Sequence, residues 1–90
     1  MPRGGVRLRT EEGKINQIGP RVQSRRLELK LKQDEVCAKL AAQTHGFWNP
    51  AWQDISRIEN GARIVTDLEM LALAKALNCE ASWLLEGPTA

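Results

Sequence analysis

The sequence predicts an all-α domain of five helices preceded by a short extended arm. Three observations lead to this prediction. Apolar residues recur at helical spacing from residue 18 onward, and helix start and stop signals divide those stretches. A third is length, because 90 residues are typical of one small domain. We therefore divide the chain into a basic N-terminal arm, residues 1–17, and a helical domain, residues 18–90.

The arm differs in composition from the helical domain. Residues 6–9 read Val-Arg-Leu-Arg, and a turn signal with one glycine occupies residues 10–14. This alternation predicts an extended segment followed by a turn. Our hypothesis is that the arm packs on its own domain or on a second subunit.

The first helix begins near Pro20, which suits the first helical position because its missing N–H is not needed there. Its inward stripe contains Val22, Arg26 and Leu29. A second helix begins near Gln33, and Gly46 ends or follows it. Its inward-facing residues are Val36, Cys37 and Leu40.

The remaining helices are marked by their ends. Asn49 and Pro50 predict the N-cap and first position of a third helix that stops at Asn60-Gly61. Thr66 and Glu69 form a capping box, which opens a fourth helix. That helix carries Leu68, Leu71, Leu73, Ala74 and Leu77. Asn78 can take a left-handed cap, residues 81–86 form a short fifth helix, and we expect Trp83 in the core or in a dimer contact.

Composition excludes several classes of protein. The two cysteines and one histidine lack the spacing of a zinc site, and Cys37 and His45 lie about 12 Å apart along a continuous helix, too far for a nucleophile and its base. We therefore expect that the protein is not an enzyme and that it binds no metal and no cofactor. No apolar run reaches the roughly 18 residues of a membrane span, so we expect no membrane partner and a cytoplasmic protein with reduced thiols.

The charge is unevenly distributed along the chain. The formal total is only +2, yet residues 1–33 carry nine Lys or Arg and three Glu, a net charge of +6. Residues 34–90 carry four basic and eight acidic side chains, a net charge of −4. This segregation indicates a basic face and an acidic face.

Three stretches carry an ordered set of residues: RVQSRR at 21–26, QDEVC at 33–37 and ISRIENG at 55–61. Together they resemble the phage repressor and Cro type of helix-turn-helix domain, also called the XRE family. The resemblance covers residues 18–86. It implies a five-helix repressor-like domain that binds operator DNA as a dimer, with the second and third helices as the reading unit.

The outward face of the third helix supplies the candidate base readers. Because Ile55 and Ile58 face the core, we place Trp52, Gln53, Ser56 and Arg57 on the outward face. A glutamine can bond adenine with two hydrogen bonds, and an arginine can do the same to guanine. For Arg57 a phosphate contact or a solvated charge remains the alternative.

Other residues are assigned to phosphates or to structure. The candidate phosphate contacts are Gln33, Arg21, Asn60 and Arg63, each with a solvated side chain as the alternative. The resemblance further implies that Arg26 and Glu59 form a partly buried ion pair between the first and third helices.

The chain departs from the family pattern in its turn. Fourteen residues separate Leu40 from Ile55, about eight more than the tight family turn, and part of this insertion extends the second helix. The insertion contains Phe47 and Trp48, and Trp52 lies just beyond it, so three of the four aromatic residues fall within six consecutive positions. They form either a small core that stiffens the turn or an exposed contact with another protein.

The sequence therefore leaves two candidate functions. The first is sequence-specific binding of double-stranded DNA as a homodimeric transcriptional regulator, with two recognition helices about 34 Å apart. The alternative is a protein-interaction module, such as an antitoxin-like regulator, that uses the aromatic insertion at residues 46–52. The weakly basic third helix favours the alternative, because Asp54 and Glu59 oppose its one arginine.

Overall fold

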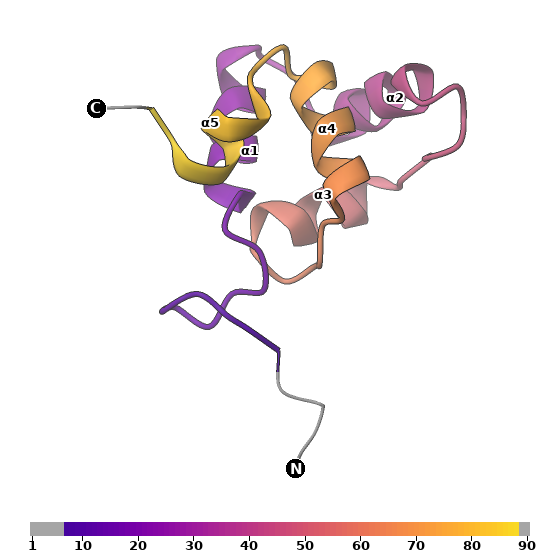
Figure 1. The fold of residues 1–90 in the computed structure, drawn as a ribbon. Coiled ribbons are helices and arrows are strands. Elements are labelled where there is room, and N and C mark those ends of the chain that lie inside the picture. Colours follow the sequence, from indigo (N-terminus) through magenta and orange to yellow (C-terminus); the bar gives the residue numbers. More distant parts are fainter. Residues whose placement is uncertain (1–6, 89–90) are drawn as a thin grey trace.

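The computed structural model describes residues 7–88, which fold into five helices without a strand among them (Figure 1). The all-α expectation is confirmed. The helices are α1 (Gly19–Glu28), α2 (Gln33–Gln43), α3 (Trp52–Glu59), α4 (Asp67–Ala76) and α5 (Ala81–Glu86). None of the helices within residues 7–88 has the length and apolar character required to cross a membrane.

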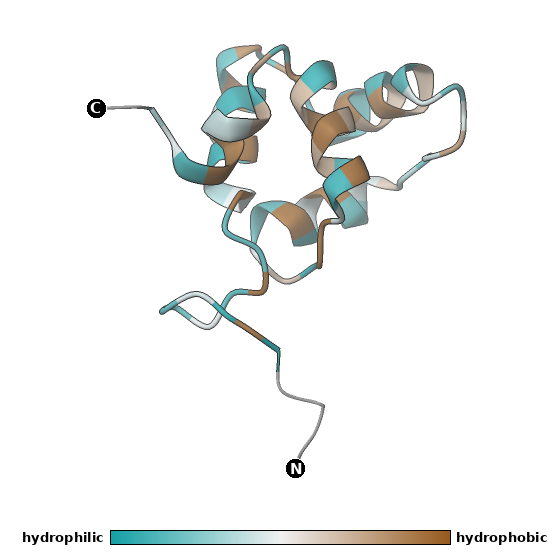
Figure 2. Ribbon diagram, in the orientation of Figure 1, coloured by the Kyte–Doolittle hydropathy of each residue, from teal (hydrophilic) through white to brown (hydrophobic). Residues whose placement is uncertain are grey.

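The core lies where the helices face one another. Helix α3 packs on α1 and α2, α4 packs on α2, and α5 packs on α4. Figure 2 shows that apolar residues alternate with hydrophilic ones along the helices. The side chains with no exposed surface come from all five helices and the residue after α4: Val22, Val36, Leu40, Ile55, Ile58, Leu73, Leu77 and Leu84. Trp83 is half-buried against this core.

Close packing of α1 on α3 depends on a glycine. A Cβ atom on Gly19 would lie 2.5 Å from the Ile58 carbonyl oxygen and 2.6 Å from that of Glu59. Both neighbours are backbone atoms that cannot move aside. The first turn of α1 can therefore approach the end of α3 only because residue 19 has no side chain.

Helix ends follow local signals with one exception. Thr66 Oγ1 accepts a hydrogen bond from the Glu69 N–H, and the Glu69 carboxylate accepts one from the Thr66 N–H, both at 3.1 Å, which confirms the capping box. Asn78 has a φ of 53°, the left-handed conformation expected after α4. Helix α2 runs to Gln43, so part of the insertion extends it as expected.

The predicted start of the third helix at Asn49 and Pro50 is wrong. Helix α3 begins at Trp52, and Ala51 is its extended N-cap residue. Asp54 decides this start, because its Oδ2 accepts a hydrogen bond from the Ala51 N–H at 3.0 Å and so satisfies a donor at the helix entrance. Pro50 is instead buried in the α2–α3 loop.

The end of the arm, residues 14–17, packs on its own domain, whereas the exposed residues 7–9 extend from it. A tight turn closes through hydrogen bonds from Gly13 N–H to the Thr10 carbonyl and from Thr10 N–H to the Lys14 carbonyl, both 2.9 Å. The Ile15 N–H then donates to the Gly61 carbonyl at 2.9 Å, which attaches the arm to the loop after α3. Of the two packings in our hypothesis the structure shows the intramolecular one; residues 1–6 lie outside the described range.

Candidate nucleic-acid interface

Helix α3 presents one face to the core and one to solvent. Ile55 and Ile58 are fully buried, whereas Trp52, at the first position of the helix, is 53% exposed. The predicted base readers Gln53 and Arg57 are exposed as well. The structure thus brings the four predicted residues together on one helix, although the fourth, Ser56, is half-buried.

The orientation of α3 is fixed by a carboxylate at its end. Arg26 Nε donates to Glu59 Oε2 at 2.6 Å, and Arg26 Nη2 donates to Glu59 Oε1 at 3.1 Å. Gln33 Nε2 also donates to Glu59 Oε1, at 3.0 Å. Because the Glu59 side chain is only 2% exposed, these charge-assisted bonds tie α1 and α2 to α3 within one buried cluster.

The start of α3 carries a second carboxylate, Asp54. Its Oδ1 lies 3.4 Å from Arg57 Nη1 and 3.9 Å from Arg63 Nε. The Arg57 side chain is 61% exposed, so this ion pair is a weak surface contact. Arg57 can exchange Asp54 for a base or a phosphate at small energetic cost.

Three of the four predicted phosphate contacts are engaged within the molecule. The Gln33 amide is bonded to Glu59. Arg21 donates to the carbonyl oxygens of Leu84 and Leu85 at 2.9 and 2.8 Å, and so caps the end of α5. The third engaged side chain is that of Arg63, which bonds Glu69. Of the four, only the exposed Asn60, directly after α3, has no such side-chain hydrogen bond within the described residues.

Arg63 is held by Glu69. Two guanidinium nitrogens donate to the Glu69 carboxylate at 2.9 and 3.2 Å, and the guanidinium lies over the Trp48 ring at 5.7 Å from its centre. The hydrogen bond to Glu69 is the largest cause that raises the pKa of Arg63. Burial alone would raise the pKa of Glu69, but its hydrogen bonds to Arg63 and Thr66 outweigh burial and lower it.

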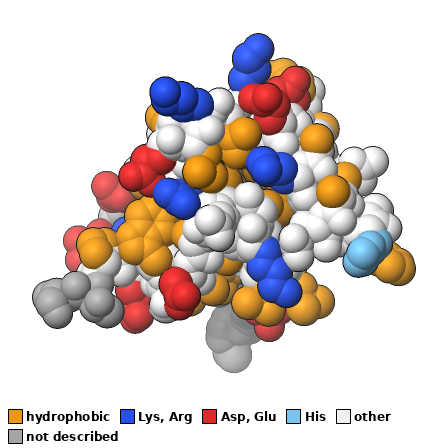
Figure 3. Space-filling model, turned by 90° about the horizontal axis from the view of Figure 1, so that it is seen from above, with side chains coloured by type: hydrophobic (Ala, Val, Ile, Leu, Met, Phe, Trp, Pro, Cys, Tyr) orange, Lys and Arg blue, Asp and Glu red, His pale blue; other side chains and the backbone are white. Residues whose placement is uncertain are grey.

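Arg25 accounts for further positive charge that the sequence count assigned to a basic face. Its Nε donates to the Leu77 carbonyl at 2.9 Å and its Nη2 to the Asn78 carbonyl at 3.1 Å, at the end of α4. A cation is favourable there because the carbonyl end of a helix is negative. Figure 3 accordingly shows Lys and Arg side chains interspersed with acidic and apolar ones on the face it presents, and no continuous basic patch among the described residues there.

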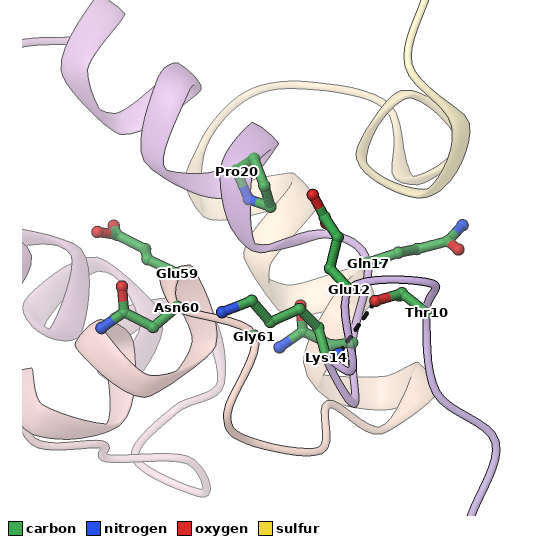
Figure 4. Close-up of a pocket in the computed structure, with 9 residues that line it drawn as sticks. Thr10, Glu12, Lys14, Gln17, Pro20, Glu59, Asn60 and Gly61 are labelled. Carbon is green, nitrogen blue, oxygen red and sulfur yellow. Dashed lines mark hydrogen bonds between the residues drawn. The ribbon is translucent and has the colours of Figure 1, made fainter.

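Lys14 is a candidate phosphate contact that the sequence patterns did not single out. The aliphatic part of its side chain covers Gly61, where a Cβ atom would lie 2.8 Å from Lys14 Cβ. The side chain extends from the arm toward Asn60 at the end of α3, along a shallow pocket of about 220 Å³ (Figure 4). The arm is basic in composition, but the spacing of its residues did not reveal which of its basic side chains reaches α3.

Asn16 holds the arm in this position. Its Nδ2 donates to the carbonyl oxygens of Ile58 at 3.1 Å and Arg63 at 2.8 Å, on either side of the loop after α3. Its Oδ1 accepts the Gly19 N–H at 3.0 Å at the start of α1. One amide side chain therefore joins the arm, α1 and the end of α3, and keeps Lys14 beside Asn60.

The two aromatic residues of the α2–α3 loop have opposite environments. Trp48 is half-buried and packs against the core, as the small-core interpretation requires. Phe47 is 95% exposed, as the exposed-contact interpretation requires. Each interpretation of the insertion therefore describes one of its residues.

Within residues 7–88 no three His, Cys, Asp or Glu side chains are grouped so that they could hold a metal ion. Comparisons with protein-family models, with curated proteins and with solved structures gave no match to this chain. The assignment of function therefore depends on the residues and their geometry.

Proposed function

We propose that this protein binds double-stranded DNA in a sequence-specific manner, as a homodimeric transcriptional regulator that acts by occupying its site. The observation that carries the proposal is the outward row of Trp52, Gln53 and Arg57 on a helix whose other face is fully anchored. A rigid helix with exposed polar side chains near its start is the element that enters a major groove in helix-turn-helix proteins.

The side chains of α3 have separate roles in this proposal. Gln53 has no hydrogen-bond partner within the described residues and is available to an adenine edge. Arg57 exchanges Asp54 for a guanine edge, and each such pair discriminates by about 1–3 kcal/mol. Trp52, half of whose surface is exposed, contacts a thymine methyl group or a sugar.

In this proposal, contacts to the DNA backbone come from the arm, from the residue after α3 and from the start of α2. Lys14 and Asn60 lie at the C-terminal end of α3. Lys32, exposed at the N-cap of α2, can place its ammonium group on a phosphate. The Gln33 side chain does not take part, because its amide is bonded to Glu59.

The exposed Phe47 favours the second candidate function, a protein-interaction module. In that case partner binding involves the α2–α3 loop, and the polar row on α3 remains solvated. The two functions differ in what substitution of α3 does, because only DNA binding requires Gln53 and Arg57.

Selection from a pool of random duplexes tests the proposal. We expect a near-palindromic sequence to emerge, and Gln53→Ala to relax the preference at one base pair in each half-site. Gln23→Ala on α1 is the matched control, because it removes the same exposed side chain from another helix. The proposal fails if no sequence is enriched, or if Gln53→Ala and Arg57→Ala both bind the enriched duplex like the unmodified protein.

A further inference from the structure

An apolar face remains uncovered beside α4. A groove of about 160 Å³ separates the α2–α3 loop from α4, lined by Thr44, Phe47, Trp48, Leu68, Glu69 and Ala72. Phe47 is 95% exposed, Leu68 is 75% exposed, and Leu71, one turn further along α4, is 50% exposed. Large contiguous apolar side chains on a surface indicate a contact with another molecule.

The loop holds Phe47 outward through its backbone. Thr44 Oγ1 donates to the Leu40 carbonyl at 2.9 Å and accepts the Trp48 N–H at 2.9 Å, which clamps both ends of the turn. His45 and Gly46 between them have φ values of 54° and 83°. A left-handed conformation is unfavourable for His45, so the turn that projects Phe47 is maintained by these contacts.

Two opposite charges on α4 lie at equal distances from Leu71, the centre of this face. Leu68, Leu71 and Lys75 follow one exposed stripe, and Asp67 lies four residues before Leu71 as Lys75 lies four after it. Neither Asp67 nor Lys75 forms an ion pair within the described residues. The nearby Glu69 is neutralised by Arg63 at 2.9 Å.

We propose that this face binds a second copy of the chain, with the two α4 helices antiparallel and crossing at Leu71. A two-fold axis through that point places Asp67 of each copy opposite Lys75 of the other, which makes two ion pairs from side chains that have none within the described part of a single chain. Phe47 lines the groove beside Leu68, so the same axis also brings the two Phe47 side chains to the interface, where each can cover the open, largely apolar groove of the other copy.

The inference rests on the proposed function in one respect, since it supplies the interface of the proposed homodimer. The paired charges select a second copy over an unrelated partner. A different protein could cover Phe47, Leu68 and Leu71, but only a copy of this helix necessarily brings a lysine and an aspartate at the matching positions.

Charge reversal followed by sedimentation equilibrium tests this interface without DNA. Asp67→Lys places two lysines against two lysines across the axis, and Lys75→Asp places two aspartates against two aspartates. We expect each variant alone to dimerise at least about tenfold more weakly than the unmodified chain at low salt. An equimolar mixture of the two variants restores both ion pairs, so we expect it to form a heterodimer.

The mixture also controls for folding, because both substitutions remain present when association returns. Phe47→Ser should weaken association, whereas Leu27→Ser, which alters a leucine 58% exposed on α1, should not. A monomeric unmodified chain, or single variants that dimerise normally, or a mixture that stays monomeric, each overturns the interface. Loss of DNA selection by a chain that still dimerises through α4 overturns the proposed function and leaves the interface standing.

Discussion

Arg26 and Glu59, 33 positions apart in the chain, are joined by two parallel hydrogen bonds of 2.6 and 3.1 Å. The Arg26 guanidinium also donates to the Leu31 carbonyl at 2.9 Å, in the connection between α1 and α2. A single arginine therefore fixes the entrance to α2 and the end of α3 relative to α1. The polar row on α3 has a defined position because of this contact.

Removal of Arg26 should destabilise the whole fold. In Arg26→Ala the Glu59 carboxylate stays buried with only the Gln33 amide as a side-chain partner among the described residues. Loss of one partner from a buried ion pair lowers the free energy of unfolding by about 3–5 kcal/mol. Urea denaturation followed by circular dichroism measures the change.

Glu28→Ala is the matched control, because it breaks the exposed Arg25–Glu28 pair on the same helix. We expect that variant to lose at most about 1 kcal/mol. Unchanged stability of Arg26→Ala together with weaker DNA binding would show that Arg26 contacts DNA and that its structural assignment is wrong.

Gly19→Ala should also be destabilising, although alanine is the better helix former. The added methyl group would lie within 2.6 Å of the two carbonyl oxygens at the end of α3, so α1 and α3 must separate. We expect a loss of about 1–3 kcal/mol in the free energy of unfolding. Ser24→Ala, an exposed position on α1, should change it by less than about 0.5 kcal/mol, and equal stability of the two variants would contradict the close approach.

The helices could be predicted because their signals are local. The buried residues of α2 recur at helical spacing, and Thr66 and Glu69 cap α4 from three positions apart. The start of α3 was predicted wrongly because two local signals compete there. Asp54 caps from inside the helix, and it prevailed over the Asn49-Pro50 pair.

The site was less predictable because its contacts are distant in sequence. Arg21 was assigned to phosphate from its charge, but it bonds carbonyl groups 63 and 64 residues away. Nothing in the spacing of residues reveals such a partner. The exposed residues of α3 could be predicted from the helical period alone. The position of Lys14 beside Asn60 could not, because it depends on how the arm folds back onto the domain.

Acid should remove the stabilisation that Glu69 provides. Its pKa is lower in the folded chain than in the unfolded chain, because the hydrogen bonds from Arg63 and Thr66 outweigh burial. This contribution is complete above the unfolded value of about 4.3 and is lost as the pH falls through the lower folded value. The stability difference between the unmodified chain and Glu69→Gln should therefore be large at pH 7 and small near pH 3.

Glu28→Gln serves as the control for this pH dependence, because Glu28 is 61% exposed in its side chain. Its difference from the unmodified chain should stay small at both pH values. A Glu69→Gln difference that does not shrink on acidification would show that the carboxylate charge is not the stabilising feature.

Both cysteine thiols should react slowly in the folded protein. Burial is the largest cause that raises the pKa of Cys37, and Asp34 and Asp54 raise it further. Burial likewise raises the pKa of Cys79. Since the thiolate is the reactive form, an aromatic disulfide reagent at pH 7 should modify both thiols rapidly only after denaturant is added. Rapid modification of both thiols in the native chain would contradict the raised pKa values of Cys37 and Cys79.

The salt dependence of binding to a selected duplex and to a scrambled duplex is the most direct measurement of the central claim that α3 reads DNA. We expect a preference of about a thousandfold or more for the selected duplex near physiological salt. With Lys14 and Lys32 of each subunit on phosphates, affinity should fall with salt with a logarithmic slope of about −4. Equal affinity for the two duplexes at every salt concentration would contradict the claim.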